Sequence, residues 1–275
     1  MKRGSRQLLS KAGTSGDQKL DQYFLTDDRI LDRLQEYALN FNCQKVLEVG
    51  AGIGNLTDKL VQISEEVIAV EIDSRLVGFL KSEFKEEICQ NNLHLIHGDI
   101  LSIDLPSYTL SVSNLPYELS SKILFKLLPN KVPMILMVQK EFANRLCAKS
   151  NTPEYGRITI TTGHYADVEI LEIVPPSAFN VKPAVESAIV KLVPSEPEYN
   201  LEDERVFLNL VTAVFTQRRK KMSNAIRNTT HISCIENPDH VIRIMDEKLM
   251  NSRPGELSPA QFAEISNVIA KSKEN

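Results

Sequence analysis

The chain has 275 residues and a formal net charge of −4, and hydrophobic and charged residues make up 42% and 25% of it. These fractions exclude a wholly disordered, collagenous or coiled-coil protein, and the length suffices for a buried core in one large domain or two unequal ones. The longest uninterrupted apolar run, residues 132–138, has seven residues, whereas a membrane-spanning helix needs about 18. We therefore expect no membrane partner.

The four cysteines lie far apart, at positions 43, 89, 147 and 234, and form neither a CxxC pair nor a cysteine–histidine cluster at zinc spacing. This pattern argues against a disulfide scaffold and against a metal site, and it favours a reducing compartment. We therefore expect a cytoplasmic protein without a bound metal.

Residues 1–20 carry five basic residues against one acidic residue, Asp17, and contain no apolar core. The segment therefore does not resemble a secretory signal. We predict a flexible, solvated basic arm that can touch RNA phosphates. An organelle transit peptide is the alternative, since no acid precedes Asp17.

From residue 28 onward, segments with helical spacing alternate with short apolar runs. Apolar residues three and four apart predict helices at residues 28–39, 55–63, 74–87, 119–128 and 140–149. Short apolar runs predict strands at residues 45–50, 67–72, 93–97, 109–113, 132–138, 157–165 and 185–192. This alternation is typical of an α/β fold with a parallel, doubly wound, Rossmann-like sheet. The last two strands predict an antiparallel hairpin at one edge, with a proline-rich loop at residues 174–183 between them.

The proline-rich, polar stretch at residues 194–200 is the best candidate for a linker. No strand pattern follows it, and helical spacing recurs at residues 206–215, 222–228, 238–248 and 259–271. The sequence therefore predicts a sheet domain at residues 21–195 and a small all-helical domain at residues 196–275.

A glycine-rich turn follows the first predicted strand, at residues 48–54 (EVGAGIG). Glycines such as Gly50 and Gly52 let the backbone turn tightly and approach a nucleotide-type ligand. The dinucleotide fingerprint G-x-G-x-x-G would require glycine at position 55, which is Asn55. The turn instead suits a ligand whose amino-acid portion lies over the loop, such as S-adenosylmethionine.

Two acidic residues follow the next two predicted strands. Glu71 ends the second strand, where a carboxylate can accept hydrogen bonds from ribose hydroxyls, and Asp99 follows the third, where it can accept from an adenine amino group. A single glycine is better explained by a turn alone. The glycine loop, Glu71 and Asp99 together, in this order at successive strand ends, favour a nucleotide site.

The tetrapeptide Asn114-Leu115-Pro116-Tyr117 ends the fourth predicted strand. The amino group of adenine is a poor nucleophile, and the Asn114 side-chain carbonyl with a nearby backbone carbonyl can accept its two hydrogens and orient its lone pair. Pro116 makes the turn rigid, and Tyr117 offers a ring for the base to stack on, worth about 1–3 kcal/mol. Taken alone, this motif is nearly as well explained by a proline turn with a core tyrosine.

With these motifs in order, the chain resembles the ribosomal RNA adenine dimethyltransferases of the KsgA type. The resemblance covers about residues 18–230. It is carried by residues 22–25 (QYFL), 48–54, 70–73 (VEID), 98–99 (GD), 114–117 (NLPY), 138–145 (VQKEFANR), 155–157 (YGR), 174–179 (VPPSAF), 183–190 and 217–220 (QRRK).

The resemblance implies that residues 21–195 form a methyltransferase domain that contacts S-adenosylmethionine through Tyr23, Leu25, Gly50, Glu71, Asp99 and Asn114. It also implies that Phe179 stacks on the target base opposite Tyr117. Many members have glycine and asparagine at the positions of Asp21 and Tyr23, so here Tyr23 is expected to contact the cofactor through its backbone.

Four adjacent cations, at positions 218–221, lie in an acid-free run of residues 214–231. Such a run is usually a solvated helix face. In this otherwise acidic chain, Arg218, Arg219, Lys220 and Lys221 form a better RNA-binding candidate than most charge runs, and we expect Lys140 and Arg145 to extend their surface.

The sequence therefore predicts a monomeric cytoplasmic enzyme that dimethylates adenines of small-subunit ribosomal RNA, in RNA or a pre-ribosomal particle, with S-adenosylmethionine as cofactor. The alternatives are a large-subunit RNA methyltransferase that confers antibiotic resistance, and a non-catalytic RNA-binding assembly factor. A nicotinamide oxidoreductase is disfavoured by Asn55.

Overall fold

The computed structural model describes residues 3–14 and 23–272. The chain divides into two compact units. The sheet unit comprises Met1–Ala143 and Val168–Pro194, and the helical unit comprises Asn144–Asp167 and Ser195–Asn275. Within the described ranges, no helix has the length and apolar character needed to cross a membrane.

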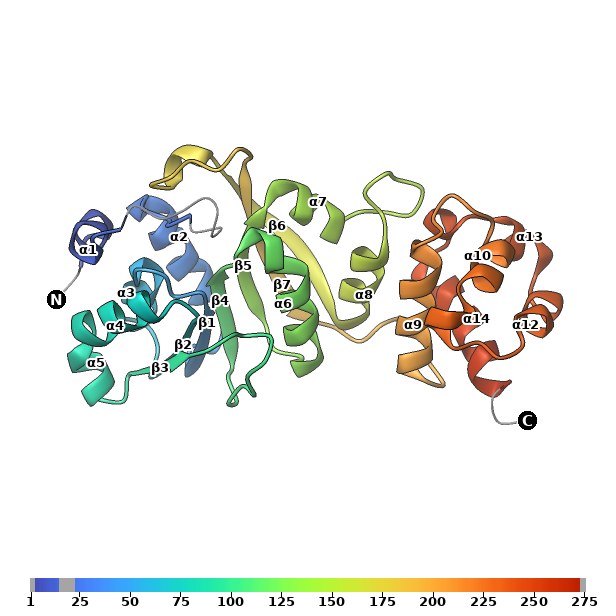
Figure 1. The fold of residues 1–275 in the computed structure, drawn as a ribbon, viewed down its shortest axis with the longest axis horizontal. Helices are drawn as coiled ribbons and strands as arrows, with labels where there is room; N and C mark the ends of the chain where they lie inside the picture. The colour runs from blue at the N-terminus through green and yellow to red at the C-terminus, as the bar shows by residue number, and fades with distance from the viewer. Residues whose placement is uncertain (1–2, 15–22, 273–275) are drawn as a thin grey trace. The chain divides into compact units, whose positions relative to one another are not determined.

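The sheet unit is built around a seven-stranded sheet with the order β3-β2-β1-β4-β5-β7-β6, which helices flank (Figure 1). Its strands are β1 (Lys45–Val49), β2 (Glu66–Glu71), β3 (Leu93–His97), β4 (Leu110–Asn114), β5 (Met134–Gln139), β6 (Ala166–Val174) and β7 (Ser187–Pro194). The first five strands, β1 to β5, pair with one another in parallel, and β7 runs antiparallel to β5. The predicted α/β class with an antiparallel edge is therefore confirmed.

Two helices of the sheet unit, α2 (Asp28–Ala38) and α4 (Ser74–Glu83), begin at aspartate side-chain caps. The other helices of this unit are α1 (Ser5–Ala12), α3 (Asn55–Leu60), α5 (Lys85–Cys89), α6 (Ser120–Leu127) and α7 (Lys140–Leu146), whose last residues belong to the helical unit. The carboxylates of Asp27 and Asp73 cap α2 and α4 by accepting from the N–H groups of Arg29 and Arg75.

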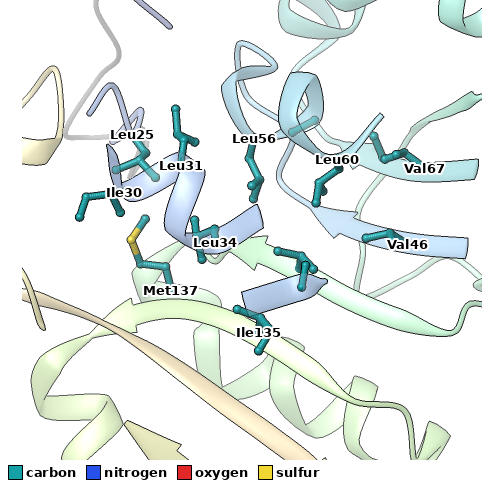
Figure 2. Packing of buried hydrophobic residues seen from close by; sticks show 14 of the residues in the cluster. Leu25, Ile30, Leu31, Leu34, Val46, Leu56, Leu60, Val67, Ile135 and Met137 are labelled. Atoms are coloured by element: carbon teal, nitrogen blue, oxygen red, sulfur yellow. The ribbon is translucent and has the colours of Figure 1, made fainter. Parts of the chain in front are cut away.

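The main core lies between α2 and the sheet. Leu31 and Leu34 on one face of α2 are fully buried against side chains of the neighbouring elements, among them Ile135 and Met137 of β5 (Figure 2). The apolar spacing of residues 28–39 thus predicts both the helix and the face that it buries.

The structure differs from the predicted flexible arm at residues 3–14. Here α1 is docked by Arg3, whose guanidinium pairs with Asp58 at 3.0 Å and Glu87 at 2.8 Å and lies 4.3 Å from the ring centroid of Phe84. Leu9 also packs against a small apolar cluster of the sheet unit. Opposite charges contributed by α3 and α5 hold this part of the arm, and the rest of the predicted arm, residues 1–2 and 15–20, lies outside the described residues.

The strand predicted at residues 157–165 is wrong, because this segment forms the helix α8 (Arg157–Tyr165). The alternating Ile158 and Ile160 suggest a strand, but the intervening Thr159 and Thr161 are buried as well. Burial all round favours a helix over a one-sided strand, so tertiary packing outweighs the β-branched composition. The strand β6 follows immediately and was not predicted.

The helical unit packs its own core around α9. Its other helices are α8, α10 (Met222–Asn228), α11 (Thr230–Ser233), α12 (Pro238–Ile244), α13 (Glu247–Asn251) and α14 (Pro259–Lys271), with α9 at Glu204–Phe215. Phe207 of α9 and Phe262 of α14 are fully buried in this core. Because residues 144–167 group with it, the unit includes a segment that the sequence boundary at residue 196 assigns to the sheet domain.

Candidate active site

A pocket of about 320 Å³ opens at the carboxyl ends of β1, β2 and β4. Most of the predicted site residues line it: Tyr23, Gly50, Gly52, Glu71, Asp99, Asn114, Leu115, Pro116 and Tyr117. Parallel strands end at one edge of a sheet, so residues that follow separate strands meet there. Leu25, Phe179 and the predicted RNA-binding cations do not line this pocket.

The glycine loop has a backbone that only glycine adopts without strain. Gly50, Gly52 and Gly54 have φ angles of 76°, 58° and 85°. A Cβ on Gly52 would lie 3.2 Å from the ring of Phe24, and one on Gly54 would lie 2.5 Å from the ring of Phe84. The glycines therefore permit close packing behind the loop as well as a close approach of ligand in front of it.

The Glu71 carboxylate is oriented by three backbone N–H groups at the edge of the pocket. Its Oε2 accepts from Gly52 at 2.8 Å, and its Oε1 accepts from Ile72 at 2.8 Å and Asp73 at 2.9 Å. Oε2, which accepts a single N–H, keeps a lone pair for a ligand hydroxyl. Asp99 is oriented in the same way, since its Oδ1 accepts from the N–H of Leu101 at 2.9 Å.

A buried polar pair supports the loop from behind. The Thr57 hydroxyl donates to Glu48 Oε2 at 2.6 Å, and the Glu48 side chain is 1% exposed. Burial raises the pKa of Glu48 to about 8, the hydrogen bond from Thr57 opposes this rise, and the charge of Glu71 adds to it.

Asn55, whose identity excludes the dinucleotide fingerprint, has a structural role. Its Nδ2 donates to the backbone carbonyl of Leu25 at 2.7 Å in a buried position. Leu25 is itself buried, and this hydrogen bond joins the segment before α2 to the glycine loop. The sequence carries no signal for this contact, because asparagine after a glycine loop is equally compatible with a helix cap.

Asn114, which lines the pocket, has a side-chain oxygen without a hydrogen-bond partner among the described residues. Its Nδ2 donates to the backbone carbonyl of Tyr23 at 3.2 Å, which leaves Oδ1 as a buried atom without a hydrogen-bond partner among the described residues. Asn55 Oδ1, Ser111 Oγ and Thr162 Oγ1 are also buried and unpaired, but of these four residues Asn114 alone lines the pocket, where a ligand can supply the donor. The Pro116 carbonyl accepts from both the Leu119 N–H and the Ser120 hydroxyl, so the Leu115 carbonyl is the better second acceptor.

Phe179 lies differently from the expected base-stacking position. Its side chain is 3% exposed and packs in the main core. The backbone explains this placement: residues 24–26 pair with residues 178–180 through a bridge between Leu25 and Phe179, and the N–H of Asn180 donates to Phe24 at 3.0 Å. This pairing directs the Phe179 ring inward.

The ring that faces Tyr117 belongs to Tyr23. The two ring centroids are 5.4 Å apart and the planes are inclined by 22°, which is a stacked arrangement. The Tyr117 hydroxyl is also 2.6 Å from the hydroxyl of Ser187 on β7. The sequence singles out Tyr23 only as a backbone contact, because a stack between side chains so far apart in the chain leaves no local pattern.

The basic cluster lies in the turn between α9 and α10, not on a helix face. The Arg218 guanidinium donates to the carbonyls of Pro153 and Thr152 at 2.6 and 2.8 Å, and the Lys221 ammonium donates to the Asn251 side chain at 3.0 Å. Arg218 therefore has a structural role within the helical unit.

The other residues predicted to contact RNA differ in whether their side chains form hydrogen bonds or ion pairs within the protein. Arg219 and Lys220 are exposed, and their side chains form no hydrogen bond or ion pair with residues 3–14 and 23–272. Lys140, in the sheet unit, pairs with Glu186 at 2.7 Å, whereas Arg145, near the end of α7, is exposed.

Within residues 3–14 and 23–272, no cluster of three or more histidine, cysteine, aspartate or glutamate side chains is placed to hold a metal ion.

Two kinds of sequence comparison place this chain among known proteins. The family model described as "Ribosomal RNA adenine dimethylase" matches residues 13–271. The chain is 50% identical to a protein of Natronomonas pharaonis named "Probable ribosomal RNA small subunit methyltransferase A", over 96% of this chain and 97% of that one. It is 43% identical to a protein of the same name from Methanococcoides burtonii, over 97% of each chain.

Solved structures agree with the sequence comparisons. A dimethyladenosine transferase from Plasmodium falciparum superposes with a TM-score of 0.73 at 28% identity, over 89% of this chain and 96% of the other. The 23S rRNA methyltransferase ErmE superposes with a TM-score of 0.62 at 25% identity, over 90% of this chain and 99% of that one. The chain belongs to the ribosomal RNA adenine dimethylase family.

Proposed function

We propose that this protein transfers methyl groups from S-adenosylmethionine to the exocyclic amino group of adenines in small-subunit ribosomal RNA, two to each base. The buried, unpartnered Oδ1 of Asn114 at the pocket carries the proposal, because it needs a donor that no described residue supplies. Relatives named as small-subunit methyltransferases, at up to 50% identity, favour the small-subunit substrate over the large-subunit one of ErmE.

The pocket residues fit S-adenosylmethionine. The positive-φ glycines Gly50 and Gly52 allow the amino-acid portion to lie against the loop, and the Glu71 and Asp99 carboxylates keep acceptor capacity for the ribose hydroxyls and the adenine amino group. Bound there, S-adenosylmethionine supplies an electrophilic methyl group on its sulfonium.

Asn114 orients the target nitrogen. Its Oδ1 and the Leu115 carbonyl accept the two amino hydrogens, which draws the nitrogen toward tetrahedral geometry and directs its lone pair at the methyl group. No strong base is required, because the nitrogen becomes acidic as it takes on positive charge. Positioning of this kind contributes roughly 7–11 kcal/mol to a barrier.

The Tyr117 ring is the stacking surface for the base, and its hydroxyl contact to Ser187 holds it in place. RNA phosphates are held by the cations of the basic cluster, chiefly the exposed Arg219 and Lys220, and by Lys140 and Arg145. Arg218 and Lys221 contribute less, since their donors are engaged within the helical unit.

We further propose that the protein acts as a monomer in the cytoplasm, on a pre-ribosomal particle. Every residue that lines the pocket comes from the sheet unit of one chain, and all four cysteines are free thiols, as a reducing compartment maintains them.

The test is methyl transfer from tritiated S-adenosylmethionine to small and large ribosomal subunits purified from cells that lack the gene. We expect label in the small subunit only, with mass mapping of RNA fragments that shows two methyl groups on a single adenine. Label in the large subunit would support the ErmE-like activity. Tight binding to small subunits without any transfer would support the non-catalytic assembly factor.

A further inference from the structure

The stack between Tyr23 and Tyr117 lies where the target base has to be. Both side chains line the pocket beside Asn114, and the Tyr23 carbonyl receives the Asn114 amide hydrogen. Tyr23 thus lines the same pocket as Asn114, whose oxygen the proposed function assigns to the adenine amino group.

A base does not fit between these two rings as they stand. Stacked aromatic rings have centroids about 4.5–7 Å apart, so two rings that hold a base between them must be separated by two stacking steps and not by one. The observed 5.4 Å is the distance of a direct stack. One of the rings has to leave before the base can stack on Tyr117 from this side.

The two tyrosines are not equally free to move. The Tyr117 hydroxyl is 2.6 Å from that of Ser187, a fully buried residue of β7, so the Tyr117 side chain is held at its hydroxyl as well as at the backbone. Among the described residues, none forms a hydrogen bond with the Tyr23 hydroxyl. Tyr23 is therefore the ring that yields, while its backbone carbonyl can remain on Asn114.

We propose that the Tyr23 side chain is a placeholder for the target adenine: it covers the face of Tyr117 until a base taken out of the RNA displaces it. This inference rests on the proposed function. Displacement exchanges one aromatic stack for another, so a base can compete with Tyr23, whereas a phosphate or a ribose gains no stack in return. Tyr23 thereby determines what is admitted to Tyr117.

This proposal differs from a role for Phe179 as the second aromatic partner of the base. The Phe179 ring is buried in the core beside Leu25, and to reach the base it would have to break the pairing of residues 24–26 with residues 178–180. The Tyr23 ring already lies on Tyr117.

The experiment compares wild type with Tyr23→Ala and Tyr23→Phe in single-turnover methyl transfer to unmethylated small subunits, over a range of subunit concentrations. Tyr37→Ala is the matched control, since Tyr37 is another half-buried tyrosine packed against the same core, outside the pocket. A Tyr–Tyr stack shifts the equilibrium between the covered and the open Tyr117 ring about two- to tenfold toward the covered state. We therefore expect Tyr23→Ala, which lacks the stack, to raise the ratio of the maximal rate to the half-saturating subunit concentration by about that factor.

Tyr23→Phe keeps the stack, so its ratio is expected to rise less than that of Tyr23→Ala, and Tyr37→Ala is expected to match wild type. Calorimetry should show S-adenosylmethionine affinity within twofold of wild type in Tyr23→Ala. An unchanged ratio in Tyr23→Ala would overturn the proposal, and a lowered ratio would show that Tyr23 supports the base instead of standing in for it. Absence of transfer by the wild type would contradict the proposed function, which is a separate outcome.

Discussion

Gly54 is the position at which a single methyl group should damage the glycine loop most. Its φ of 85° is a left-handed conformation that costs a residue with a Cβ about 1–2 kcal/mol. The added Cβ would lie 2.5 Å from the ring of Phe84 and 2.9 Å from Leu80, and Arg3 packs on that same ring, so the ring has little room to retreat. Overpacking of a core costs about 1–3 kcal/mol. We therefore expect Gly54→Ala to lower the free energy of unfolding by about 2–5 kcal/mol.

The assay is urea unfolding followed by circular dichroism, with Gly78→Ala as the matched control. Gly78 lies in α4, and apart from its two chain neighbours and its own helix backbone no heavy atom lies within 4 Å of the place that an alanine Cβ would take. Alanine there should therefore be neutral or stabilise by up to about 1 kcal/mol. A second substitution, Phe84→Leu, should recover part of the loss in Gly54→Ala. Equal stability of Gly54→Ala and Gly78→Ala would refute the packing described for the loop.

Three further predictions test the surroundings of the site. The raised pKa of Glu48 means that the folded state keeps a proton that the unfolded state releases, so the free energy of unfolding should fall as the pH rises from about 4.5 to about 8. Glu48→Gln should remove this part of the fall, which a pH series of urea titrations would measure. Phe179→Ala should cost about 3–5 kcal/mol of stability as a core truncation, seen in the same titration, whereas unchanged stability with lost transfer would indicate a base-stacking role. The double variant Arg219→Gln/Lys220→Gln should flatten the slope of log RNA affinity against log salt by about 1.4–1.8 in filter binding, and an unchanged slope would assign both cations to a solvated surface.

The pocket was predictable because its signals are local. Gly50, Glu71, Asp99 and Asn114 lie at or just after the end of a strand that a short apolar run identifies, and parallel strands bring their ends together at one edge. The chemistry of each residue type then indicates the ligand group that it can hold. The antiparallel edge was predicted from two successive strands with no helix between them, whereas the strand order was not predicted.

Several features that the sequence did not predict depend on partners far away in the chain. Arg3 is ordered by Asp58 and Glu87, which are 55 and 84 residues away, and a count of basic residues cannot show such pairs. Arg218 belongs to a charge cluster in the sequence, yet backbone carbonyls 65 and 66 residues away engage it. The inward direction of Phe179 likewise depends on its pairing with Leu25.

The strand predicted at the residues of α8 was wrong for a different reason. Its isoleucines and threonines favour a strand by composition and by alternation, and only burial on every side shows that it is a helix. Such burial comes from the helical unit to which residues 144–167 belong. The local pattern and the tertiary environment disagree there, and the environment determines the structure.

The most direct test of the proposed chemistry is the single-turnover rate of methyl transfer by Asn114→Ala on unmethylated small subunits. Loss of one preorganised polar group in an active site costs about 10²–10³ in rate, so we expect a fall of that size, with RNA and S-adenosylmethionine affinities within a few-fold of wild type. Asn92→Ala is the control, because Asn92 also donates to backbone carbonyls but lies outside the pocket. A rate for Asn114→Ala within a few-fold of wild type would contradict the assignment of its free oxygen as the group that orients the target nitrogen.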